Sequence, residues 1–467
     1  NDRAEYDVRG MGAGPDVDVA AIRASQIGLI TAIVEKQWMG SVCLNVGFIP
    51  SKFLLRNAEL AHILRERTKE FGISVENLQL DYSAAVKRSR QVSNRLTKGI
   101  GLLMRKNNID QYMGVARLAA RDRVVVLDAD GKSQELVTKN VIIATGARSA
   151  LIPGVVPDGE KILTYLEAIL QEKRPASVVI IGAGAIGMEF ATIWSSYGTE
   201  VTIVEMLPRI LPLEDEEVSN ELAKAFTKRG VRLLTGTRVQ KVETTDTGVR
   251  VTVGEGDALQ VLEAEQALVA IGFKPNSADL GLEEVGVELT ERKFIKIDGH
   301  MATNVPGIWA IGDVTGQLLL AHVASAQGIV CAESIAGVDT VALDYRMMPR
   351  ATYCQPQVAS FGLTEAQAKE AGYEVKIGRF PFQPNGKALG LGDYAGFAKI
   401  ITDAKYGEIL GAHLIGPEVS ELLPELTLAQ RMELTAAEIA RNVHAHPTLS
   451  EVLMEAAHGV EGHPIHI

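Results

Sequence analysis

Cysteine, aromatic residues, surplus positive charge and long apolar runs are all scarce in this chain of 467 residues. The 3 cysteines are too few, and odd in number, for a disulfide-stapled secreted domain or a cysteine-rich zinc module. The 47 Lys and Arg residues against 58 Asp and Glu leave a net charge of −11, which argues against nucleic-acid binding. No apolar run reaches the ~18 residues of a membrane-spanning helix, and Asn1–Val8 shows no secretory signal. These absences predict a cytoplasmic protein with no nucleic-acid or membrane partner.

Glycine, by contrast, is plentiful at 44 residues, and it marks two copies of one pattern. Each copy reads strand, glycine turn, helix, strand. Gly12 to Glu35 and Gly182 to Glu205 both span 23 residues. Repeats of this kind are typical of doubly wound sheets that bind dinucleotides. At ~100–200 residues per domain the chain is long enough for two to four domains. We therefore predict an α/β fold with two doubly wound dinucleotide-binding domains.

The second copy carries a complete fingerprint, Gly182-x-Gly184-x-x-Gly187, between an expected strand over 178–181 and an expected helix over 188–197. The first glycine allows the tight turn, the second lets the backbone approach a pyrophosphate, and the third lets helix and strand pack closely. Glu205 ends the next strand, where a carboxylate binds ribose hydroxyls and repels a 2′-phosphate. An unrelated tight turn would explain the glycines alone. The strand, helix and acid together favour an NAD site.

The first copy keeps Gly12 and Gly14 but departs from the pattern around them. The departures are Arg9 and Gly10 in the strand and Asp16, Val17 and Asp18 after the turn. Two carboxylates are electrostatically unfavourable beside a pyrophosphate, and Val17 replaces the third glycine, so we expect it to push the helix away from the strand. The matching distance to Glu35 still supports a dinucleotide site.

The segment Gly40–Lys52 reads GSVCLNVGFIPSK, which resembles the redox-active segment CLNVGCIPSK of the flavin disulfide oxidoreductases, most closely of the dihydrolipoyl dehydrogenases. The resemblance covers nearly the whole chain. It includes both glycine units and four further segments: Ala144–Gly146, Gly312–Asp313, Leu320–Ala324 and His446–Glu451. It implies an FAD-binding domain at 1–149, an NAD-binding domain at 150–270, a segment completing the FAD site at 271–344, and an α+β dimerisation domain at 345–467.

The resemblance also implies roles for single residues. Glu35 would bind the adenosine ribose of FAD, Asp313 the ribityl chain, and Ala321 would lie close to the isoalloxazine. Lys52, paired with Glu189, would lie near flavin N5, where a positive charge stabilises the reduced flavin. Gly146 and Gly272, each at the end of a buried apolar run, join the expected cofactor-binding positions.

The family's chemistry requires two cysteines five positions apart, and here Cys43 is followed by Phe48. Phenylalanine has no redox couple, and neither Cys331 nor Cys354 has the spacing to replace the missing sulfur. Three interpretations remain open: an inactivated family member, a branch that transfers hydride through FAD without a disulfide, or a local error in the sequence.

His446 and Glu451 complete the expected catalytic set. In the family this histidine comes from the partner subunit of a homodimer and takes a proton from dihydrolipoamide, while the glutamate orients it. Thr448-x-x-Glu451 is also a helix capping box, and both roles can hold at once. His444 is the rival base, but the Pro-Thr-x-Ser-Glu string follows His446. The other histidines show no metal-ligand spacing, so no metal site is expected.

The implied reaction converts dihydrolipoamide and NAD to lipoamide and NADH, and the implied partner is the lipoyl domain of a 2-oxo acid dehydrogenase complex. Two alternatives stand beside it because of Phe48. One is a disulfide-independent FAD and NAD(P)H reductase, such as a diaphorase, quinone reductase or transhydrogenase. The other is a redox-dead structural homologue. The histidine–glutamate pair counts against a transhydrogenase, which has no thiol to deprotonate.

Overall fold

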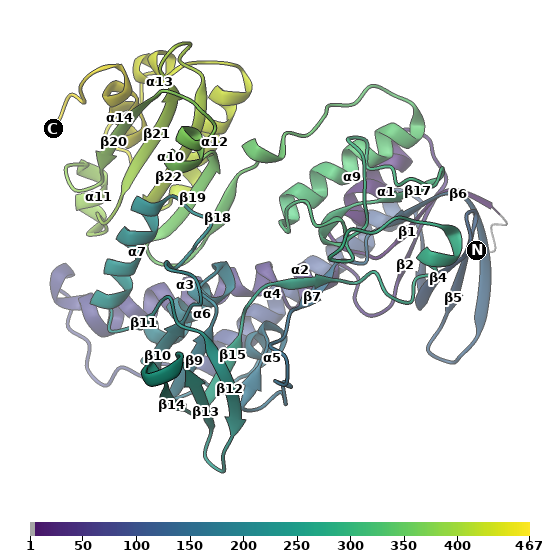
Figure 1. Ribbon diagram of the computed structural model, residues 1–467, viewed down its shortest axis with the longest axis horizontal. Coiled ribbons are helices and arrows are strands. Elements are labelled where there is room, and N and C mark those ends of the chain that lie inside the picture. The colour runs from purple at the N-terminus through teal and green to yellow at the C-terminus, as the bar shows by residue number, and fades with distance from the viewer. Residues whose placement is uncertain (1–4) are drawn as a thin grey trace. The chain divides into compact units, whose positions relative to one another are not determined.

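The computed structural model describes residues 5–467, which form two compact units (Figure 1). The first unit comprises the chain up to residue 51 together with 87–150 and 272–345, and the second comprises 52–86, 151–271 and 346–467. The division into four functional segments stays a prediction. Within residues 5–467, no helix combines the length and apolar character needed to cross a bilayer.

The first unit is built on a seven-stranded sheet. Its parallel part runs in the order β3 (Asp110–Met113), β2 (Thr31–Glu35), β1 (Glu5–Met11), β6 (Ser133–Ile143) and β17 (Ile308–Ala310). The antiparallel strands β5 (Arg123–Leu127) and β4 (Val115–Ala120) extend from the first half of β6. Strand β6 is continuous because its first half pairs with β5 and its second half pairs with β1 and β17.

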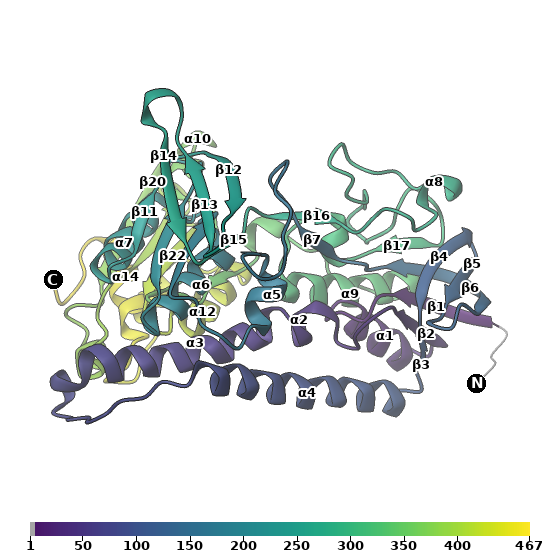
Figure 2. The same cartoon turned by 90° about the horizontal axis from the view of Figure 1, so that it is seen from below.

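Helices pack on one face of the parallel part of this sheet, and the antiparallel strands β4 and β5 pack on its other face. Helix α1 (Val17–Gln26) packs beside α9 (Ala321–Ala336), as Figure 2 shows, and small residues of α1 join one apolar core with Val8, Ile33 and Ile142. Met11, Val34 and Ile143 point to the opposite core, shared with β4 and β5. This alternation along the strands fixes their register, because a shift by one residue would reverse every side chain.

Shorter elements complete the first unit. They are α2 (Ser41–Asn45), β7 (Ala147–Ser149), β16 (Phe273–Pro275), α8 (Leu282–Val285) and the 3₁₀ turn η4 (Gly312–Thr315). Strands β7 and β16 form an antiparallel pair. Helices α3 (Phe48–His62) and α4 (Tyr82–Lys106) each contribute residues to both units, and the short turns η1 (Ile63–Arg67) and η2 (Thr68–Phe71) follow α3.

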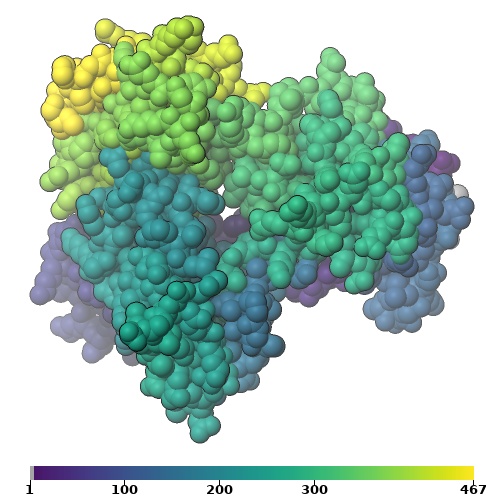
Figure 3. All heavy atoms as spheres, in the orientation of Figure 1, coloured from purple at the N-terminus to yellow at the C-terminus, as the bar shows by residue number. Residues whose placement is uncertain are grey.

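The second unit holds another parallel sheet, in the order β11 (Arg232–Leu234), β10 (Glu200–Val204), β9 (Ser177–Ile181), β15 (Gln266–Val269) and β8 (Ile162–Leu163). Its helices are α5 (Tyr165–Leu170), α6 (Ala185–Ser196) and α7 (Glu216–Lys228). Three antiparallel strands, β12 (Val239–Thr244), β13 (Val249–Val253) and β14 (Gln260–Ala264), share an apolar core with this sheet. Residues 255–261, with the turn η3 (Gly256–Ala258), are exposed, and Figure 3 shows this teal end projecting from the surface.

The C-terminal part of the second unit is an antiparallel sheet in the order β18 (Arg350–Thr352), β19 (Gln357–Gly362), β22 (Ile409–Gly416), β21 (Phe397–Asp403) and β20 (Val375–Pro381). The turn η5 (Tyr345–Met347) precedes it. Its helices are α10 (Glu365–Glu370), α11 (Gly386–Leu391), α12 (Val419–Arg431), α13 (Ala436–Arg441) and α14 (Glu451–Glu461). Every residue of the central strand β22 is buried, as expected for a strand covered on both faces.

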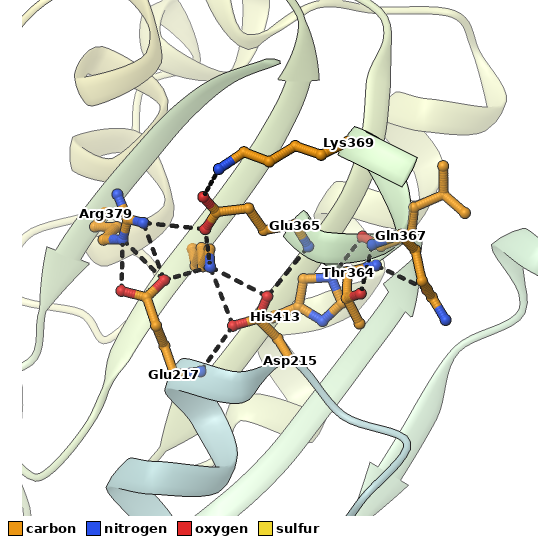
Figure 4. A network of polar contacts seen from close by, with 10 residues as sticks. Asp215, Glu217, Thr364, Glu365, Gln367, Lys369, Arg379 and His413 are labelled. Carbon is orange, nitrogen blue, oxygen red and sulfur yellow. Dashed lines mark hydrogen bonds and ion pairs between the residues drawn. The ribbon is translucent and has the colours of Figure 1, made fainter. Parts of the chain in front are cut away.

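A buried ion network joins α7 to this antiparallel sheet within the second unit (Figure 4). The ammonium of Lys399 on β21, whose side chain is 1% exposed, lies 3.1 Å from both oxygens of Asp215 and 2.7 Å from Glu365. It also pairs with Glu217, which Arg379 of β20 contacts at 3.0 Å. Asp215 additionally caps α7 by accepting a hydrogen bond from the Glu217 amide.

Candidate functional site

The turn after β1 requires glycine for a steric reason. Gly12 has φ of +128°, and a Cβ at this position would lie 2.3 Å from the carbonyl oxygen of Ala144. The corresponding Gly182, after β9, has φ of +107° and would place a Cβ 2.1 Å from the carbonyl oxygen of Ala270. Both turns therefore bring the backbone against the neighbouring strand end, the arrangement expected of a dinucleotide cradle.

The two cradles also carry equivalent carboxylates. Glu35, at the end of β2, accepts hydrogen bonds from the amides of Gln37 (2.9 Å) and Trp38 (3.4 Å). Glu205, just after β10, accepts hydrogen bonds from the amides of Ala183 and Leu207, both at 2.8 Å. Each buried carboxylate is thus held in a fixed position at a strand end, where it can receive ribose hydroxyls.

The cradles differ in how helix and strand pack. In the second, a Cβ on Gly187 would lie 2.0 Å from the carbonyl oxygen of Gly182 and 3.2 Å from Ile180 Cγ2, so only glycine fits. In the first, Val17 stands at the position of Gly187, and Gly10 at the position of Ile180. A Cβ on Gly10 would lie 2.6 Å from Val17 Cγ1. The Val17 side chain therefore occupies the space left by the missing side chain of Gly10. For this reason Val17 does not push the helix away from the strand, contrary to what was expected from Val17 alone.

The other irregular strand residue, Arg9, is fully buried. Its guanidinium lies over the rings of Tyr6 (4.4 Å) and Tyr112 (5.6 Å), and burial lowers its pKa to about 10. Cation–π contacts of this kind offset part of the desolvation of a buried cation. Strand β1 consequently keeps its place in the sheet despite a charged residue.

Three carboxyl groups gather where the first cradle meets η4. Asp16, 6% exposed, accepts a hydrogen bond from the Val17 amide at 2.9 Å, and its Oδ2 lies 2.1 Å from the position of a Cβ on Gly312. Burial raises its pKa to about 8, and the charge of Asp313 contributes. Burial likewise raises the pKa of Asp18 and of Asp313 to about 6. This corner of the molecule is therefore poor in compensating positive charge.

The structure places the remaining expected cofactor residues as follows. Gly14 lies in the loop before α1, Gly184 is the N-terminal cap of α6, and Ala321 is the first residue of α9. Gly146 (φ +71°) precedes β7 and Gly272 (φ +113°) precedes β16; the Gly146 carbonyl accepts from the Asn276 amide and the Gly272 carbonyl from the Ala150 amide. The expected flavin-completing positions of the first unit thus lie on its sheet ends and at the start of α9.

The redox segment is divided between two helices. Cys43 lies in α2 and is partly buried, whereas Phe48 begins α3 and is 37% exposed. A Cβ on the intervening Gly47 would lie 2.8 Å from the Val42 carbonyl oxygen, so the connection is tight. Cys331 and Cys354 are fully buried, and burial raises the pKa of both thiols. Neither presents a thiolate to solvent.

Lys52 and Glu189, expected as a pair from the resemblance, are in contact within the second unit. The Lys52 ammonium donates hydrogen bonds to both carboxylate oxygens of Glu189 at 2.8 and 3.0 Å. Tyr353 joins them: its amide donates to Glu189 Oε1 at 3.0 Å, and its ring centre lies 4.4 Å from the ammonium. Tyr353 thus contacts both members of the pair, and no sequence pattern predicts this contact, since Tyr353 lies 164 positions from Glu189.

The C-terminal histidines occupy contrasting environments. His446 Nδ1 lies 2.8 Å from Glu451 Oε1, and in the single chain the His446 side chain is 80% exposed. Glu451 also accepts a hydrogen bond from the Thr448 amide at 2.7 Å, but α14 begins at Glu451 with Ser450 as its N-cap and no side-chain capping bond, so the expected Thr448–Glu451 capping box is only half formed. Burial raises the Glu451 pKa, but the Thr448 and His446 hydrogen bonds outweigh it and keep that pKa below its usual value. His444, only 4% exposed, is held by Glu425 at 2.8 Å. The outward-facing member is thus His446.

Comparison with known proteins identifies a family and several relatives that match the chain over almost its whole length. A family model described as pyridine nucleotide-disulphide oxidoreductase matches residues 11–328, and the model of that family's dimerisation domain matches residues 348–457. Dihydrolipoyl dehydrogenase of Mycobacterium leprae is 54% identical, covering 98% of this chain and 99% of the relative. Dihydrolipoyl dehydrogenase of Corynebacterium glutamicum is 50% identical, with coverage of 98% and 99%.

Solved structures agree with these matches. The crystal structure of LpdA from Mycobacterium tuberculosis has a TM-score of 0.90 at 26% identity and covers 97% of this chain and 99% of that one. The flavoprotein disulfide reductase RclA from Escherichia coli has a TM-score of 0.85 at 24% identity, covers 96% and 98%, and supports the fold. The expected fold class, resemblance and use of FAD and NAD by the family are confirmed.

Proposed function

The chain belongs to the pyridine nucleotide-disulphide oxidoreductase family, and we propose that its reaction is that of a dihydrolipoyl dehydrogenase, in which dihydrolipoamide and NAD⁺ give lipoamide, NADH and a proton. The curated relatives carry that name along almost their whole length. Two electrons and one proton leave the dithiol for the nicotinamide, and the second thiol proton goes to solvent. Electron transfer between sulfur and nicotinamide is the chemistry that bound FAD would supply.

The observation that carries this proposal is the contact of His446 with Glu451 at 2.8 Å. A histidine held by a carboxylate is suited to take a thiol proton near neutral pH, because its unperturbed pKa is ~6.5. A reductase that passes hydride straight through a flavin deprotonates no thiol. The pair therefore favours a dithiol substrate over the disulfide-independent reductase and over a redox-dead homologue.

The proposed roles of the remaining residues follow from their surroundings. Gly182, Gly184, Gly187 and Glu205 fit an NAD dinucleotide. A Cβ is excluded at Gly182 and Gly187, the space beside Gly184 is open, and the Glu205 carboxylate is held in place. Gly12 and Glu35 fit the adenosine end of FAD in the same way. Cys43 would supply the sulfur that meets the substrate, and Lys52, oriented by Glu189, the positive charge that favours a reduced flavin.

The proposed partners extend beyond the chain itself. The chain carries the dimerisation domain of its family. We infer a homodimer in which His446 serves the site of the partner subunit, consistent with its exposure in the single chain. The proposed substrate is carried by the lipoyl domain of a 2-oxo acid dehydrogenase complex, and a cytoplasmic location belongs to the same proposal.

Phe48 divides this reaction into two halves. The half between NADH and the flavin depends on the glycine cradles, which the chain retains. Electron transfer from the dithiol to the flavin needs a second sulfur beside that of Cys43, and Phe48 contains no sulfur. We therefore expect the chain as it stands to be reduced by NADH but to oxidise dihydrolipoamide very slowly.

The test compares the natural chain with Phe48→Cys, using Phe48→Ser as the matched control without sulfur. Restoring the sulfur should raise the NAD-dependent oxidation of dihydrolipoamide by more than about a hundredfold, while NADH–ferricyanide activity changes little. Phe48→Ser should leave the dithiol activity low. If Phe48→Cys gains no dithiol activity, the dihydrolipoamide assignment is wrong. If the natural chain, with Phe48 verified by peptide mass, is already as fast, the argument from the missing sulfur is wrong.

A further inference from the structure

The first cradle differs from the second in what its helix start binds. Gly184 is the N-cap of helix α6 and makes no side-chain capping bond, so no capping side chain binds the first amides of that helix. In α1 the amide of Val17 is bound by the Asp16 carboxylate at 2.9 Å, and the amide of Val19 by Asp18 at 2.7 Å. Helix N-terminal amides are the groups that bind a pyrophosphate in such cradles. In α1 the chain's own carboxylates already bind them.

Asp16 also fills space that the fingerprint normally leaves open. Its Oδ1 lies 2.6 Å from where a Cβ on Gly14 would be, and its Oδ2 2.1 Å from where a Cβ on Gly312 would be. The carboxylate therefore lies between the glycine that lets a pyrophosphate approach and the glycine that precedes Asp313. Both glycines are present, yet the opening they create is taken by a side chain.

We infer that Asp16 is an internal competitor of FAD: its side chain occupies the pyrophosphate position and must be displaced before the dinucleotide binds, at a greater cost when the carboxylate is charged. This inference rests on the proposed function, because it takes FAD as the occupant of the first cradle. It makes flavin affinity, and not only sulfur chemistry, a property in which this chain departs from its family.

The groups around Asp16 set its response to pH. Asp18 on the same helix and Asp313 on η4 are both acidic, and α9, which packs against the Asp16 backbone at Gly328, carries His322 and Glu333 as its residues that can be charged near neutral pH. Glu333 is paired with Arg23 at 2.8 Å. Helix α9 also carries Cys331, whose buried thiol stays protonated because burial raises its pKa. Strand β1 contributes Arg9, whose guanidinium faces Tyr6 and Tyr112. No described cation in contact with Asp16 therefore neutralises its carboxylate.

Protonation relieves the charge conflict without moving the side chain. The Asp16 pKa of about 8 means that this group is mainly neutral at pH 7 and ionises above pH 8. A bound pyrophosphate raises that pKa further, so FAD binding above pH 8 takes up a proton. The dissociation constant should then rise by up to tenfold per pH unit. Asp18 and Asp313, with pKa values of about 6 in the flavin-free chain, are already charged at pH 8, so a change in FAD affinity that begins near pH 8 distinguishes Asp16 from them.

The experiment titrates flavin-free protein with FAD between pH 6 and 9.5 and follows quenching of flavin fluorescence. Asp16→Asn keeps the size but not the charge, Asp16→Gly removes both, and Asp18→Asn is the matched control. We expect Asp16→Asn to abolish the alkaline rise and Asp16→Gly to bind FAD at least about tenfold more tightly at every pH. Asp18→Asn should keep the alkaline rise.

Each other outcome decides between the two proposals. If all four proteins bind FAD with the same affinity and the same pH dependence, Asp16 is no competitor and this inference is wrong, while the proposed function stands. If none of them binds FAD, including Asp16→Gly with a native circular-dichroism spectrum, the proposed flavin function itself is wrong.

Discussion

Replacing Lys399 by methionine is expected to loosen the antiparallel sheet of the second unit. The lysine ammonium lies 3.1 Å from both oxygens of Asp215, whose side chain is only 3% exposed. Removing one partner of a buried pair leaves an uncompensated charge and costs about 3–5 kcal/mol. The apolar methionine side chain recovers about 1 kcal/mol of that by burial. We therefore expect a net loss of about 2–4 kcal/mol in the local stability of β21.

Glu217 and Glu365 contribute less to this loss because they are partly exposed and Arg379 contacts both of them. Lys369→Met is the matched control. That lysine is 59% exposed and contacts Glu365 alone among the carboxylates, so its removal should cost at most about 1 kcal/mol.

The difference between Lys399→Met and the natural chain should also depend on pH. Burial alone would raise the pKa of Glu365, but hydrogen bonds from Lys369 and Lys399 lower it from 4.5 to about 2. A lowered carboxylate pKa contributes stability that is present above about pH 4.5 and is lost as pH falls through about 2. The two proteins should therefore converge in acid. His413, whose pKa is lowered by burial, is present in both proteins.

Hydrogen–deuterium exchange of the β21 peptide measures this local stability directly. At ~1.4 kcal/mol per tenfold, a loss of 2–4 kcal/mol is a fall in protection of roughly 30-fold to 700-fold at pH 7. Protection within threefold of the natural chain would refute the reasoning, as would a difference that does not shrink toward pH 3.

Two further predictions concern the cradle and the base. Gly10→Ile should destabilise the first unit by overpacking against Val17, and Val17→Gly should destabilise it by opening a cavity, each by about 1–3 kcal/mol in thermal unfolding. The double variant should recover most of this loss. If the two losses are strictly additive, the two side chains do not compensate for each other's volume. His446→Gln in the Phe48→Cys background should lower dihydrolipoamide oxidation about 10²–10⁴-fold and leave NADH–ferricyanide activity intact. Equal loss of both activities would show that His446 acts structurally.

The cradles could be predicted from the sequence because their requirements are local. Gly182 and Glu205 lie within one strand–helix–strand unit, and Glu205 accepts the amide of Ala183 in the same unit, although the carbonyl oxygen that excludes a Cβ at Gly182 belongs to the distant Ala270. The contact of His446 with Glu451 is equally local, at five positions. Phe48 needs no structure at all, since the absence of sulfur is a property of the residue.

Contacts between distant segments could not be predicted in this way. Lys399 meets Asp215 across 184 positions, and no periodicity links them. The approach of Asp16 to Gly312 depends on how α1, α9 and η4 pack, so the sequence showed an unfavourable charge but not the space it fills. The role of Gly10 could not be predicted for the same reason, because the space that this glycine provides is needed only where the Val17 side chain packs against it.

The exchange of volume between Gly10 and Val17 constrains the order in which the two residues could have been acquired. Starting from the arrangement kept by Ile180 and Gly187, a valine gained first would collide with the strand, whereas a glycine gained first would leave only a small hollow. The order without a steric clash is therefore glycine at position 10 first and valine at position 17 second. The intermediate with glycine at both positions is open in either direction, whereas the intermediate with isoleucine and valine is overpacked, so any exchange between the two arrangements passes through the pair of glycines.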